Sequence, residues 1–180
     1  GSMASGKQRK GSDIDFLAIG EKKELPLLEN CNIVMMEKRE FKEKYLKGDD
    51  FLISSLLFGK IILDKEFFIR FFESPLPIFS QEVIQEKIKY CHKIKERIYS
   101  LLNIDREKAQ EELLYIFLQT ARIILLKQKK IPLTKYDLAE QVEPFDKRVA
   151  KIISGLLKGK KDLNTEEILD LVEECMNVLG

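Results

Sequence analysis

The spacing of apolar residues changes at the segment ESPLPIFS, residues 73–80, and this change constrains the fold more than any other feature. Before it, apolar runs of about five residues alternate with turn signals, which is typical of short strands joined by helices. After Ser80, a suitable helix N-cap, apolar residues recur at the spacing of amphipathic helices. The pattern predicts an α/β (α+β) chain with a small mixed-sheet domain at residues 1–75 and an all-α helical bundle at residues 80–180.

The first part contains signals for both strands and helices. Strands are expected in the runs DIDFLAIG (13–20), NIVMME (32–37) and KIILD (60–64). Helices are expected over residues 39–48, 49–59 and 65–72. Asp49 or Asp50 would cap the second of these helices, while Gly48 and Gly59 would end the first and the second.

The second part shows two long stripes of apolar residues at helical spacing. The first stripe consists of Ile84, Ile88, Cys91, Ile94 or Lys95, Ile98 and Leu101 or Leu102, and the second of Leu113, Ile116, Phe117, Thr120, Ile123 and Ile124. Three further helices are expected over residues 133–142, 145–159 and 164–179. Because short loops join these amphipathic segments, they should pack as a bundle.

The overall charge is balanced, with 31 basic and 30 acidic residues and a formal net charge of +1. Nucleic acid is therefore not indicated as a partner, and any nucleotide site must be local. Cys31, Cys91 and Cys175 are far apart and His92 is the single histidine, which argues against a disulfide scaffold and a structural zinc site. The longest apolar stretch is interrupted and shorter than the roughly 20 residues that span a bilayer. With no signal-peptide pattern, the expectation is a cytoplasmic protein without a membrane span.

The first fifteen residues, GSMASGKQRKGSDID, hold the pattern with the most chemical content. Asp13 and Asp15 are two apart on an expected strand, so both side chains project from one face. Two adjacent carboxylates can bind a hard cation such as Mg²⁺, which would in turn hold nucleotide phosphates. Small residues upstream would let backbone N–H groups approach phosphate oxygens closely. Two plainer interpretations stay open: a solvated strand end, and a Gly1-Ser2 pair left by protease cleavage.

This string resembles the signature of the minimal nucleotidyltransferases of the DNA polymerase β superfamily, in which a Gly-Ser turn precedes an S-D-x-D strand at this spacing. The matching residues are Gly1, Ser2, Gly6, Ser12, Asp13 and Asp15, followed by the apolar FLAIG. The resemblance implies that Gly1, Ser2, Gly6 and Ser12 contact the triphosphate and that Asp13 and Asp15 are catalytic ligands of Mg²⁺. The implied activity transfers a nucleoside monophosphate to a hydroxyl of a protein or small molecule. The donor would be ATP, which gives AMP, or another nucleoside triphosphate, which gives the corresponding monophosphate.

One departure from the family concerns its third carboxylate, which is expected on the neighbouring strand where this chain has Asn32. A neutral amide oxygen is a weaker cation ligand than a carboxylate and a poor general base. Glu29 and Glu37 fall on the opposite face of that strand by alternation. The alternative is therefore a degenerate nucleotidyltransferase fold that acts as a nucleotide-binding, antitoxin-like or assembly module.

The helical part resembles the HEPN-like domains that accompany minimal nucleotidyltransferases, and the helical half of kanamycin-type aminoglycoside nucleotidyltransferases. The segment ARIILLKQKKIPLTKYDLAEQV, residues 121–142, lies at its centre. The resemblance implies that the bundle shapes the acceptor side, or binds a protein partner or a second copy of the chain. HEPN ribonucleases have a histidine shortly after an arginine; no histidine follows Arg122, so ribonuclease activity is not expected. The nearby lysines, Lys127, Lys129, Lys130 and Lys135, are expected to be solvated surface, with phosphate binding as the alternative.

Overall fold

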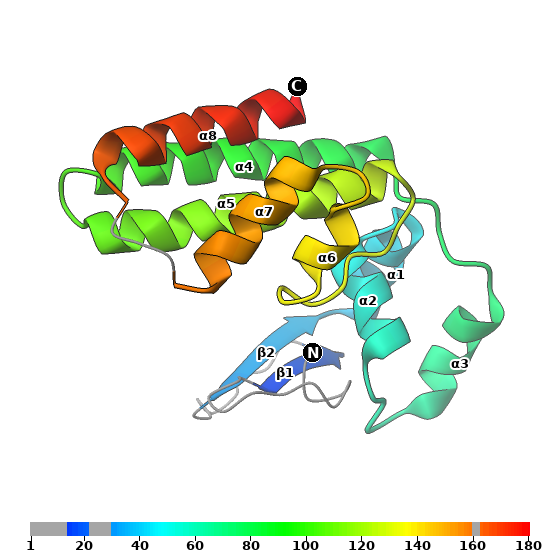
Figure 1. Cartoon of the computed structure of the whole chain (residues 1–180). Coiled ribbons are helices and arrows are strands. Elements are labelled where there is room, and N and C mark those ends of the chain that lie inside the picture. The colour runs from blue at the N-terminus through cyan, green and yellow to red at the C-terminus, as the bar shows by residue number, and fades with distance from the viewer. Residues whose placement is uncertain (1–13, 22–29, 160–162) are drawn as a thin grey trace. The chain divides into compact units, whose positions relative to one another are not determined.

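The computed structural model describes residues 14–21, 30–159 and 163–180 (Figure 1). These residues are mostly helical and include one two-stranded sheet. The chain divides into two compact units, Gly1–Ser80 and Gln81–Gly180, called unit 1 and unit 2 below. A mixed α+β composition is what the change in apolar spacing predicts.

The sheet of unit 1 consists of β1 (Ile14–Ile19) and β2 (Cys31–Met36). The two strands are parallel, with Ile14 opposite Cys31 and Ile19 opposite Met36. Both strands carry apolar residues on both faces, and most of these side chains are half-buried. Within the described part of the chain, the sheet consists of this parallel pair, and the mixed sheet expected for residues 1–75 stays a prediction.

The expected strand at residues 60–64 is wrong. These residues form an irregular link between α2 (Asp50–Phe58) and α3 (Lys65–Glu73). Asp64 is the N-cap of α3, where its side chain accepts a hydrogen bond from the Phe67 N–H at 3.3 Å. A short apolar run has the same period whether it pairs with a strand or only joins two helices, so the sequence pattern did not distinguish the two.

Local backbone conformation and side-chain capping set the ends of the helices in unit 1. α1 (Lys38–Leu46) is followed by Gly48, whose φ of 81° lies in the left-handed region that favours glycine. A Cβ atom there would lie 2.6 Å from the Ile78 carbonyl oxygen, so the close backbone approach also requires glycine. Asp49 caps α2 by accepting a hydrogen bond from the Leu52 N–H at 3.0 Å.

Aromatic rings join α1 to α3. The ring centroids of Phe41 and Phe71 are 5.0 Å apart and those of Tyr45 and Phe71 are 4.9 Å apart, both in edge-to-face arrangements. The Tyr45 hydroxyl donates a hydrogen bond to the Phe71 carbonyl oxygen at 3.1 Å. Phe67 and Phe68 complete this aromatic cluster, in which Phe41 is fully buried.

Unit 2 is a helical bundle arranged around α5 (Arg106–Lys127), which packs against the other four helices of the unit (Figure 1). These are α4 (Gln81–Leu101), α6 (Leu138–Val142), α7 (Lys147–Leu157) and α8 (Thr165–Leu179). α5 buries the expected stripe except Ile124, which is half-buried, and it also buries residues outside the stripe, among them Leu118, Ala121 and Leu125. A helix with neighbours on several sides is apolar around most of its circumference.

Side-chain hydrogen bonds determine where α6 and α8 of unit 2 begin. The helix expected over residues 133–142 begins only at Leu138, because Gln141 binds the backbone of Ile131 and Leu133 and holds the preceding residues in a loop. α8 begins with a capping box, in which Asn164 and Glu167 each accept a hydrogen bond from the other's backbone N–H.

Among the helices of the described ranges, none combines the length and the apolar content needed to cross a membrane.

Candidate functional site on the strand pair

Most of the expected phosphate- and metal-binding residues lie outside the described residues. These are Gly1, Ser2, Gly6, Ser12 and Asp13. Asp15 is described: it is the second residue of β1 and its side chain is exposed. The geometry of the candidate site is therefore built from Asp15 and its neighbours on the strand pair.

Asn32 of β2 lies directly opposite Asp15 in the parallel register. Its Nδ2 donates a hydrogen bond to Asp15 Oδ1 at 3.4 Å, and both side chains are exposed. Residues opposite each other in a sheet point to the same face, which explains why these two polar groups meet. The neighbouring pair, Phe16 and Ile33, points to the other face of the strand pair and is half-buried.

The Asn32 amide limits the chemistry of this pair. As a neutral donor it orients the Asp15 carboxylate, but it cannot accept a proton as a general base would. At 3.4 Å the hydrogen bond is long, and a half-turn of the amide would present its oxygen in place of its nitrogen. The pair can thus offer a cation one carboxylate and one amide oxygen, both hard ligands of the kind that Mg²⁺ accepts.

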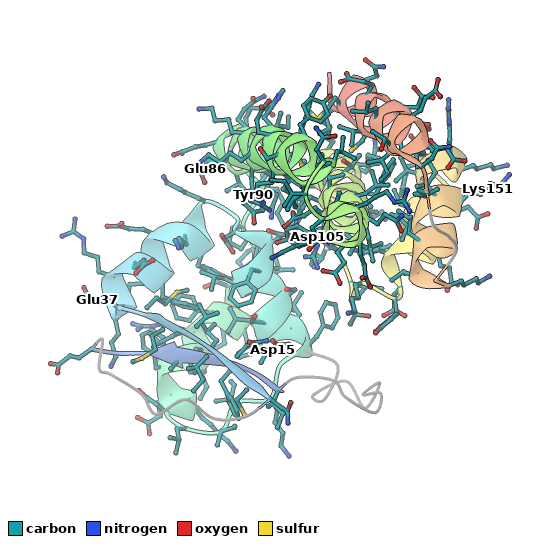
Figure 2. The ribbon with its side chains drawn as sticks, turned by 90° about the vertical axis from the view of Figure 1, so that its left-hand side faces the viewer. Asp15, Glu37, Glu86, Tyr90, Asp105 and Lys151 are labelled. Carbon is teal, nitrogen blue, oxygen red and sulfur yellow. The ribbon has the colours of Figure 1, made fainter. Side chains whose placement is uncertain are left out.

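The described residues add no third carboxylate to this pair. Glu37 follows β2 directly and lies at the opposite end of the strand pair from Asp15 (Figure 2). Glu29 is outside the described residues. Within the described ranges, no group of three His, Cys, Asp or Glu residues is placed to hold a metal ion. On the described residues alone, the fit to Mg²⁺ is therefore partial.

Unit 2 contains an acidic groove of about 530 Å³ at α7 and α8. Its polar lining consists of Asp146, Arg148, Asp170, Glu173, Glu174 and Asn177. Asp146 caps α7, and Glu174 forms an ion pair with Arg148. Most of these acids are thus engaged in local structure, and the groove shows no convergent catalytic set.

Glu173 joins α8 to α4. Its Oε1 accepts hydrogen bonds from Lys95 Nζ at 2.7 Å and from the Tyr99 hydroxyl. The hydrogen bond from Lys95, followed by that from Tyr99, lowers the pKa of Glu173, and the same carboxylate raises the pKa of Lys95. Because the carboxylate is held in its charged form and the amine in its protonated form, neither group is prepared for proton transfer at neutral pH.

A second network joins α4 to α5 through tyrosine and arginine. The Tyr90 and Tyr115 rings meet edge to face at 6.1 Å, and Arg97 binds Glu112 at 2.7 Å while lying 5.9 Å from the Tyr90 ring. Burial, followed by its contact with Tyr90, raises the pKa of Tyr115. Sequence reasoning missed this network and the one at Glu173, because both pair residues that are distant along the chain.

The two cysteines of unit 2 and Lys127 have structural roles. Burial raises the pKa of Cys91 to about 12 and that of Cys175 to about 11, so neither is a reactive thiolate at neutral pH. Cys175 Sγ lies 2.8 Å from Thr120 Oγ1 in the core. Lys127 Nζ donates to the Leu179 carbonyl oxygen at 3.3 Å, which fixes the end of α8.

Comparison of the chain with family models, with curated proteins and with solved structures finds no match in any of the three.

Proposed function

We propose that this protein is a Mg²⁺-dependent nucleotidyltransferase that moves a nucleoside monophosphate, AMP from ATP, to a hydroxyl of a protein or small molecule. The observation that supports this best is the contact between Asp15 and Asn32 across neighbouring strands. It brings a carboxylate at the end of the S-D-I-D string together with an amide, and a half-turn of that amide would present a second hard oxygen ligand. Asp13 would complete the ligand set.

The transfer is an in-line displacement at phosphorus. The acceptor oxygen bonds to the α-phosphorus, the bond from that phosphorus to the bridging oxygen breaks, and pyrophosphate leaves with the electron pair. A bound Mg²⁺ would supply charge neutralisation of the triphosphate and alignment of the acceptor. Asn32 cannot take the proton of the acceptor hydroxyl, so in this proposal the proton would pass to solvent water.

The chain's own residues would act by binding and orienting. Asp15 would hold the cation through its exposed carboxylate, and Asn32 would fix the orientation of that carboxylate through its amide. Gly1, Ser2, Gly6 and Ser12 would contact the phosphates, as the resemblance to the nucleotidyltransferases implies. The HEPN-like bundle would shape the acceptor side or bind a partner.

The test is incubation with α-labelled ATP and Mg²⁺, with detection of pyrophosphate and of labelled product. We expect Asp15→Asn to reduce transfer at least about a hundredfold, because the variant loses a charged cation ligand. Glu21→Gln is the matched control, since it removes an exposed carboxylate that follows the other end of β1. Equal activity of Asp15→Asn and wild type, or no Mg²⁺-dependent nucleotide binding at all, would reject the proposal.

The second candidate function is a nucleotide-binding module without chemistry, as in the degenerate alternative. The donation of an N–H from Asn32 to Asp15 favours it, because the family position for a third carboxylate here holds a group without basic character. Titration with a non-hydrolysable ATP analogue separates the two functions. Binding without any pyrophosphate release from ATP would support the module, and release would support the enzyme.

A further inference from the structure

We draw no further inference here: the strongest candidate, the acidic groove at α7 and α8 of unit 2, is a cluster of carboxylates that mostly cap a helix or pair with basic side chains of the same unit, and no second feature of the described residues points to a ligand for it.

Discussion

The Asn32 amide lies directly across from the Asp15 carboxylate on the parallel strands and donates a hydrogen bond to it at 3.4 Å. An amide at this position makes the pair compatible in the absence of a cation, since a second carboxylate there would repel the first. The amide cannot act as the general base that a carboxylate at this position would provide. One side chain thus bears on both the stability of the strand pair and the chemistry proposed for it.

Replacing Asn32 with Asp should make stability depend on Mg²⁺. Two carboxylates opposite each other on adjacent strands should lower the free energy of unfolding by about 0.5–1 kcal/mol, and a bound cation should reverse that loss. Thermal unfolding with and without Mg²⁺ measures the effect. Val34→Asp, on the same face two residues further along β2, serves as the control that should not respond to Mg²⁺. An Asn32→Asp variant with the same melting temperature in both buffers would contradict the idea of a cation site.

Replacing Gly48 with Ala should destabilise the chain by more than backbone strain alone. Gly48 has a φ of 81° and a close approach to Ile78, whereas Gly159 has a φ of 68° and open space around its α-carbon. Gly159→Ala should cost about 1 kcal/mol for the left-handed backbone, and Gly48→Ala should cost about 2–4 kcal/mol because a steric clash is added. Chemical denaturation of both variants measures the difference, and equal losses would show that the contact with Ile78 is unimportant.

The aromatic cluster should be the main source of stability for the packing of α1 against α3. Phe41 is fully buried, and truncating it to Ala should lower the free energy of unfolding by about 3–5 kcal/mol. Phe51, which is 40% exposed on α2, is the control and should lose about 1 kcal/mol or less when truncated. Urea denaturation at low protein concentration gives both values. Similar losses in the two variants would mean that the cluster does not determine the stability of unit 1.

Stability should fall at alkaline pH because of the two buried cysteines. Their folded-state pKa values of about 12 for Cys91 and about 11 for Cys175 lie above the unfolded value near 8.5. Between these values the unfolded chain loses protons that the folded chain keeps, so the free energy of unfolding decreases as pH rises through 8.5. The loss should be about 2 kcal/mol for each thiol between pH 8.5 and 10.

Cys91→Ala with Cys175→Ala should remove this part of the pH dependence, as measured by urea unfolding at several pH values. Cys31→Ala controls for the loss of a thiol from the half-buried strand pair of unit 1. If the double variant loses stability with pH as steeply as the wild type does, other groups are responsible for the alkaline instability.

Elements set by nearby residues were predicted well. The helices at α1, α2 and α8 begin or end where capping residues occur, as at Asp49 and Asn164, because a cap interacts with backbone groups only a few residues away. The apolar stripe of α4 likewise identified the buried residues Cys91, Ile94 and Ile98. The apolar run at residues 60–64 was wrongly predicted to be a strand. A strand requires a neighbouring strand to pair with, and the run itself contains no information on such a partner.

The sequence by itself determined which segments are helical, where the apolar pattern changes, and which carboxylates and glycines are available near the N-terminus. Only the tertiary structure decided that Asp15 lies opposite Asn32 and that Glu173 accepts hydrogen bonds from both Lys95 and Tyr99. It also decided that Ile62 and Leu63 stay exposed. The physical reason is the range of the forces involved. Capping and helical periodicity act within a few residues, whereas strand register and contacts between helices depend on hydrogen bonds and packing between segments far apart in the chain.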